Sequence, residues 1–134
     1  MSHWIPYNAN PKGNRDVDCT VRAISVALGQ SWDQTYAEVF LEGYIAKRMP
    51  VSNSVWRAYL RRKGFAREVL TDTCPDCYTV GDFADDHPNG VYLLGTGSHV
   101  VCIVDGNVID TFDSRGETLR DFYYYKKKKG DGNG

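Results

Sequence analysis

The chain has 134 residues, of which 42% are hydrophobic and 25% charged, and its formal net charge is −1. These values predict one soluble globular domain with a buried core, and the nearly balanced charge gives no general attraction to nucleic acid or to a membrane surface. No apolar run approaches the roughly 20 residues that span a bilayer, and the first residues lack the segments of a signal peptide, so we expect a cytoplasmic protein with reduced cysteines.

The N-terminal part of the chain predicts an irregular arm followed by a helix. Residues 1–18 are rich in Asn, Pro and Gly, and we expect their apolar side chains to be buried against the body of the protein. These side chains are Trp4, Ile5 and Tyr7. Apolar residues then recur at helical spacing over 19–28, and Gly29 follows as a helix end.

Two further helices are expected before the middle of the chain. Ser31, with Gln34 three positions later, forms a capping box that begins a second helix, which ends near Gly43. Its apolar stripe comprises Trp32, Tyr36, Val39 and Phe40. Ser52 or Asn53 caps a third helix. The inward face of that helix comprises Val55, Trp56, Tyr59 and Leu60.

The second half of the chain predicts strands joined by turns. Strands are expected over 65–70, 91–94 and 118–125, with a hairpin between the last two. Thr79 with Asp82 caps a short helix that runs to about residue 86. Because helices come first and antiparallel strands follow, the fold class is α+β, in a single domain over 1–125 with a flexible Lys- and Gly-rich tail over 126–134.

The stretch 97–112 predicts the hairpin, because β-branched runs flank Asp105-Gly106. With these two residues as the turn, position 101 lies opposite 110 and position 99 opposite 112. His99 and Asp110 are then diagonal neighbours on one face of the sheet. A three-residue loop shifts the register by one and places Asp113 opposite His99 instead, so Asp113 is the alternative carboxylate.

A His and a carboxylate on neighbouring strands are the base and the orienting group of a catalytic triad that still needs a nucleophile. Cys19 is the candidate, since it falls in the first turn of the first predicted helix. A helix N-terminus and a nearby imidazolium both favour the thiolate, whose unperturbed pKa is about 8.5. We therefore predict Cys19 as nucleophile, His99 as base and Asp110 as the residue that orients His99.

These residues carry a resemblance. A Cys at a helix start, followed after 80 residues (99 minus 19) by a His on a strand and then by an Asp on the next strand, resembles the papain-like cysteine peptidase superfamily. Over about residues 8–115 the chain is similar to small bacterial and phage proteins of that superfamily. The shared segments are Cys-x-x-Arg-Ala, Trp-x-x-x-Tyr, Cys-Pro-Asp-Cys-Tyr-Thr and a His-Val-Val hairpin ending in Asp-Thr. The resemblance implies helices packed on a C-terminal antiparallel sheet and cleavage of an amide bond in a peptide or protein, with no metal or organic cofactor.

The chain departs from the pattern of that family at the oxyanion hole. Papain-like enzymes carry a Gln six residues before the Cys, where this chain has Gly13. Asn14 is the tentative second donor beside the Cys19 backbone N–H, and Asn8 and Asn10 of the arm are further candidates. Loss of one oxyanion donor costs about 10²–10³ in rate.

Two other functions remain open. Asp18-Cys19-Thr20 together with His99 also resembles the NlpC-type cell-wall endopeptidases, although the Gly of their motif is missing here. A phage-derived peptidoglycan hydrolase is therefore one alternative. The other is a papain-like module that binds peptides without cutting them.

Three smaller features have competing interpretations. Asp18 is expected to cap the first helix. Arg22 either pairs with a neighbouring Asp or binds a substrate carboxylate. Cys74 and Cys77 form a lone Cys-x-x-Cys, which lacks the four ligands of a closed zinc site, so we expect a loop with two thiols, with a disulfide as the alternative.

Overall fold

The computed structural model of the chain describes residues 3–13, 18–50, 52–69, 77–97, 99–120 and 122–126. Over these residues the helices are α1 (Cys19–Leu28), α2 (Trp32–Ala46), α3 (Asn53–Arg62) and α4 (Val80–Asp86). The strands are β1 (His3–Pro6), β2 (Phe65–Val69), β3 (Val91–Gly95), β4 (Val100–Val104), β5 (Asn107–Asp110) and β6 (Phe122–Lys126). This is the α+β class that the order of the predicted elements indicates. No helix over the described residues combines the length and the apolar character needed to cross a membrane.

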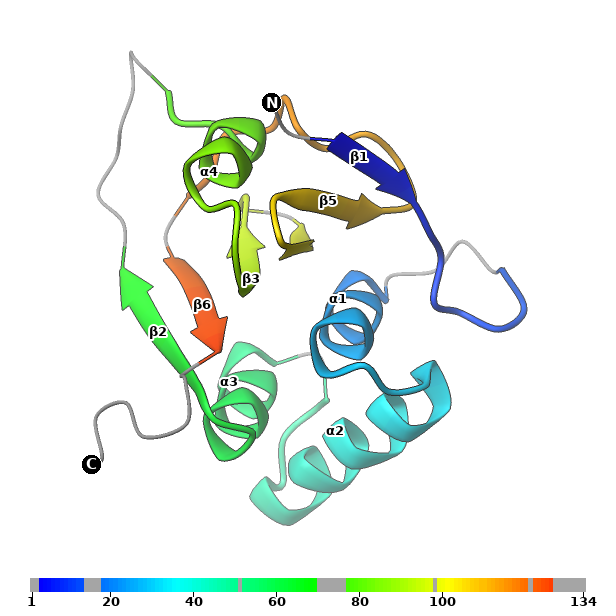
Figure 1. Cartoon of the computed structure of the whole chain (residues 1–134). Helices are drawn as coiled ribbons and strands as arrows, with labels where there is room; N and C mark the ends of the chain where they lie inside the picture. Colours follow the sequence, from blue (N-terminus) through cyan, green and yellow to red (C-terminus); the bar gives the residue numbers. More distant parts are fainter. Residues whose placement is uncertain are drawn as a thin grey trace.

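The strands form one sheet in the order β1-β5-β4-β3-β6-β2. Strand β1 pairs with β5 in parallel, and the other pairs are antiparallel. Figure 1 shows α1, α2 and α3 on one side of the sheet and α4 on the other. Side chains alternate between the faces of a strand. Leu93 and Cys102 accordingly pack against the helices α1 and α3, whereas Leu94 and Val101 pack against α4.

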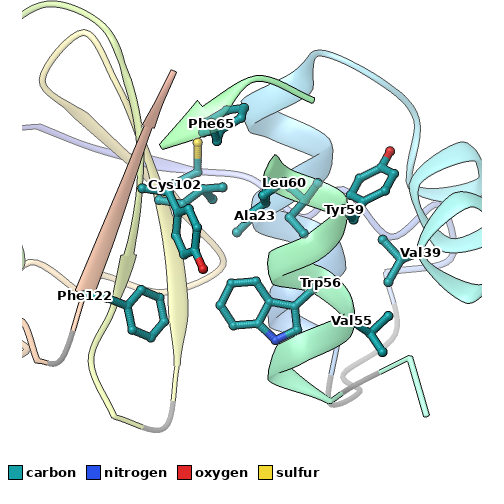
Figure 2. Packing of buried hydrophobic residues seen from close by; sticks show 12 residues of the cluster. Ala23, Val39, Val55, Trp56, Tyr59, Leu60, Phe65, Cys102 and Phe122 are labelled. Carbon is teal, nitrogen blue, oxygen red and sulfur yellow. The ribbon is translucent and has the colours of Figure 1, made fainter. Parts of the chain in front are cut away.

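The larger core lies between the sheet and the helices α1 and α3. All four predicted inward residues of α3 are buried. Figure 2 shows Trp56 of α3 facing Phe122 of β6, and their ring centroids lie 5.7 Å apart. This apolar contact fixes α3 over the last strand. It matters for function because both rings also line the cleft described below.

The hairpin has the register that the Asp-Gly turn predicts. Asp105 and Gly106 both adopt positive φ, at 48° and 80°, as a two-residue turn of type I′ requires. Ile103 of β4 lies opposite Val108 of β5, so the strands pair without a shift. Asp110 therefore ends β5 on the face that the prediction assigns to it.

The N-terminal arm differs from the prediction because it contains a strand. His3 of β1 lies opposite Asn107 of β5, a pairing between distant parts of the chain that no local pattern signals. The burial expected for the arm is also wrong at two positions, since Ile5 and Tyr7 are 42% and 54% exposed. Within β1 only Trp4 is partly buried, and Tyr7 follows the end of the strand.

The apolar stripe predicted for α2 is only partly buried. Val39 lies in the core, but Tyr36 and Phe40 are exposed. They stack in a row behind Trp32, with successive ring centroids 5.0 and 6.1 Å apart. The aromatic spacing thus reflects stacking along one helix rather than packing against the sheet.

Three predicted boundaries shift. The last predicted strand begins at Phe122 rather than at residue 118, because Thr118 makes only a single bridge, to Thr79. Helix α2 continues past Gly43 to Ala46, and Gly43 is needed inside it because an added Cβ would lie 2.7 Å from the carbonyl oxygen of Arg48. At the other end of the chain, Lys126 belongs to β6 rather than to the tail, and its Nζ donates to the Lys63 carbonyl at 2.9 Å. The rest of the predicted tail, 127–134, lies outside the described residues.

Candidate active site

A cleft of about 530 Å³ lies between the start of α1, helix α3 and the sheet. Cys19, the first residue of α1, and His99, which directly precedes β4, both line it. We call it the Cys19 cleft. Its lining also includes Asn53, Trp56, Arg57, Arg67, Val100 and Phe122.

His99 is held by Asp110. The two side chains approach to 2.6 Å between His99 Nε2 and Asp110 Oδ2, and both are largely buried. Because Nε2 faces the carboxylate, the other ring nitrogen, Nδ1, is left for the thiol of Cys19. The hairpin thus brings together the two residues that its register places on one face.

The pKa shifts of Cys19 and His99 favour their charged forms. Burial raises the pKa of the Cys19 thiol, but hydrogen bonding to His99 and to the Val100 backbone outweighs burial and leaves that pKa below its ordinary value. Burial lowers the pKa of His99, whereas hydrogen bonds to Asp110 and Cys19 raise it, and the result is about 9. Both shifts stabilise a thiolate beside an imidazolium.

Asp110 is itself fixed by several donors. Ser114 Oγ donates to its Oδ2 at 2.9 Å, and the Thr111 backbone N–H donates to its Oδ1 at 2.7 Å. Its main-chain carbonyl accepts from Trp4 Nε1 at 3.1 Å and from the Tyr7 N–H at 3.0 Å. The sequence reasoning missed Trp4 and Ser114 as supports, because one acts through a distant strand and the other looks like an ordinary turn residue.

Asp113, the alternative carboxylate, does not reach His99. It is exposed, and its Oδ2 pairs with Arg115 Nη2 at 2.7 Å. The hydrogen bond from Arg115 holds the pKa of Asp113 below its usual value. The two-residue turn that sets the hairpin register therefore also decides between the two carboxylates.

The donors expected for an oxyanion are only partly in place. The Cys19 N–H has no acceptor within α1, as at any helix start. Asn14 lies outside the described residues. Asn8 and Asn10 are absent from the described lining of the cleft, and the Asn10 amide donates to buried Asp18 at 3.3 Å. Asn53 does line the cleft, and since its Oδ1 accepts from Trp56 Nε1 at 3.1 Å, its amide NH₂ remains a donor.

Asp18 does not act as a helix cap. It stands at the N-cap position of α1, but among the described residues its side chain makes no capping hydrogen bond. Its carboxylate instead pairs with Arg22 and accepts from Trp32 Nε1 at 2.9 Å. Arg22 is thereby engaged within the protein, which is the first of its two interpretations.

Outside the cleft, Cys77 is disulfide-bonded, contrary to the expectation of free thiols in this segment. Cys74 lies outside the described residues. Among the residues that the structure describes, no three His, Cys, Asp or Glu side chains are placed to share a metal ion.

The site thus combines a polarised thiol, an imidazole and an orienting carboxylate at an open cleft, an arrangement suited to nucleophilic attack on an acyl carbon. No family model, curated protein or solved structure matches the chain. Its function must therefore be argued from this geometry.

Proposed function

We propose that the protein is a papain-like thiol hydrolase that cleaves an amide bond, peptide or isopeptide, through Cys19, His99 and Asp110. The observation that carries the proposal is the continuous contact from the Cys19 thiol through His99 to Asp110, with 2.6 Å between the last two side chains. Cys19 comes from α1, His99 from the position before β4 and Asp110 from β5, and the first two line one cleft. The same contacts lower the pKa of Cys19 and raise that of His99, as expected for a thiolate beside an imidazolium.

The reaction follows from the two charged forms. The Cys19 thiolate attacks the carbonyl carbon, and the C–N bond breaks as the His99 imidazolium gives its proton to the leaving amine. His99, now neutral, takes a proton from water, which attacks the thioester and releases Cys19. Asp110 keeps the ring in one orientation through both steps. The Cys19 N–H at the start of α1 is placed to stabilise the oxyanion.

The proposal is tested by alkylation with iodoacetamide at pH 6, followed by peptide mass mapping. Cys19 should react almost stoichiometrically and faster than free cysteine, because the free thiol is protonated at this pH. Cys102 is the internal control, since it is fully buried. A Cys19 that reacts no faster than free cysteine would overturn the proposal.

The chemistry of the substrate is tested separately. Incubation with unfolded protein and with a peptidoglycan suspension, each with wild type and Cys19→Ala, shows which amide is cut. Loss of turbidity in the wall suspension that depends on Cys19 would favour the NlpC-type alternative. The non-catalytic module would be favoured by a different result. In that case Cys19 can be alkylated, but Cys19→Ala leaves partner binding and the biological effect intact.

A further inference from the structure

The wall of the Cys19 cleft carries two arginines that have no carboxylate partner among the described residues. Arg57 comes from α3 and Arg67 from β2. None of the described residues that line the cleft is acidic. The ion pairs found among the described residues involve other cations, so neither arginine has a carboxylate partner there. Positive charge in a cleft without a counter-charge favours an anionic ligand.

Both guanidinium groups lie against the same aromatic ring. Arg57 Cζ is 5.0 Å from the centroid of Phe122, and Arg67 Cζ is 5.4 Å from it. Such contacts attract each cation to the ring and hold both guanidinium groups beside one aromatic side chain. Trp56 of α3 packs against this same ring (Figure 2). The two arginines therefore lie beside a side chain of the packed core.

The positive surface continues into a second cavity of about 390 Å³, which Arg57 and Arg67 also line. Arg61 joins them there, and we call the three residues the arginine cluster. The cavity is lined as well by Tyr124, which is 2% exposed and whose hydroxyl has no hydrogen-bond partner in the described structure. Among the described residues, the Nε of Arg57 is likewise buried without a hydrogen-bond partner. Buried donors in a native protein normally have an acceptor, and a ligand oxyanion would supply it.

We propose that the arginine cluster binds a carboxylate of the substrate, an Asp or Glu side chain near the scissile amide, so that the enzyme selects acidic peptides. The inference rests on the proposed function and names the substrate class of that site. Planar guanidinium groups match a carboxylate in a two-point fork. Because Arg57 and Arg67 line both the Cys19 cleft and the second cavity, one extended peptide can contact Cys19 and the cluster together.

The test measures how well peptides protect Cys19 from iodoacetamide in the full chain. The probes are capped tetraglutamate and capped tetraglutamine, which differ in charge and hardly in shape. Tetraglutamate should protect at a concentration about tenfold lower or more, the effect of one charge-assisted hydrogen bond. Arg67→Gln, at an exposed position, should remove most of this difference. Arg57→Lys, which keeps the charge and the packing stem, should weaken it because the fork is lost.

Arg48→Gln is the matched control, because Arg48 is exposed and is not among the residues lining either cavity. It should leave the tetraglutamate preference and the alkylation rate within twofold of wild type. If the unprotected Cys19 reacts slowly, the proposed function fails. If Cys19 reacts fast but the two peptides protect equally, or the Arg67→Gln protein keeps the preference, the substrate inference fails alone. Protection by inorganic phosphate that tetraglutamate does not match would assign the cluster to a phosphate and overturn the carboxylate.

Discussion

Two cysteines are free among the described residues, and their surroundings give them opposite character. Cys19 lies half-buried at the start of α1, where hydrogen bonds from His99 and Val100 hold its pKa below the ordinary value despite burial. Cys102 lies in the middle of β4, fully buried among apolar side chains (Figure 2), and burial raises its pKa far above that value. Cys19 is partly exposed at the cleft, whereas Cys102 is fully buried. The difference shows that donors, and not exposure alone, decide which thiol can react.

The largest expected effect comes from removing His99, the hydrogen-bonding side chain that Cys19 has and Cys102 lacks. His99→Ala should raise the Cys19 pKa toward that of a free thiol and lower amide turnover by about 10³, within the range for a general acid and base. Alkylation of Cys19 at pH 6 should fall in parallel. His3→Ala, at an exposed histidine of β1, is the control and should change neither rate. An unchanged alkylation rate in His99→Ala would mean that the imidazole does not lower the pKa of the Cys19 thiol.

Asp110→Asn should have the next largest effect. The amide keeps the shape of the side chain but loses the charge that raises the His99 pKa. We expect turnover to fall about 10²-fold, less than the 10⁴ of the corresponding change in serine proteases, because the thiol is more acidic than a hydroxyl. Steady-state turnover rates of the wild type, Asp110→Asn and Asp113→Asn measure this loss and show which carboxylate orients His99. Equal losses in the two variants would contradict the assignment of Asp110.

The pH profile should show the His99 shift directly. Since the His99 pKa is raised to about 9, the ring keeps its proton up to that pH and loses it above. Turnover should therefore stay high between the lowered Cys19 pKa and about pH 9, then fall about tenfold per unit at higher pH. In Asp110→Asn the descending limb should move to lower pH. If turnover of the wild type instead falls above about pH 6.5, the usual pKa of a histidine, then the pKa of His99 is not raised.

The smallest effect on activity is expected at the other cysteine. Cys102→Ala should leave the alkylation and turnover rates of Cys19 within twofold of wild type. It should nevertheless lower the free energy of unfolding by about 1–2 kcal/mol, because it leaves a small void in a packed core. Denaturant titration measures the loss. If turnover falls by more than the loss of folded protein accounts for, then β4 transmits packing changes to His99.

The sequence predicts much of the site because the site depends on local rules. An Asp-Gly turn of two residues fixes which residues share a face of the hairpin, and this selects Asp110 over Asp113. The helix that begins at Cys19 follows from apolar spacing and ends at Gly29, as its positive φ permits. These inferences need no knowledge of distant contacts.

The rest depends on contacts between distant segments. Strand β1 pairs with β5 across most of the chain, and no pattern in residues 1–18 specifies that partner. Arg57 of α3 and Arg67 of β2 lie beside the same Phe122 ring, a placement that depends on packing between distant segments. The exposed aromatic row of α2 has the spacing of a buried stripe, so periodicity alone misassigns it.

The support that β1 gives to Asp110 bears on the order of events during synthesis. Residues 3–6 are made before the segment 107–110 to which they bind, which follows roughly 5–20 seconds later at about 5–20 residues per second. Until then the Asp110 carbonyl cannot receive its two hydrogen bonds from Trp4 and Tyr7. A nascent chain therefore carries Cys19 without its assembled partners until residues 107–110 are made, so the proposed hydrolase would be inactive up to that point.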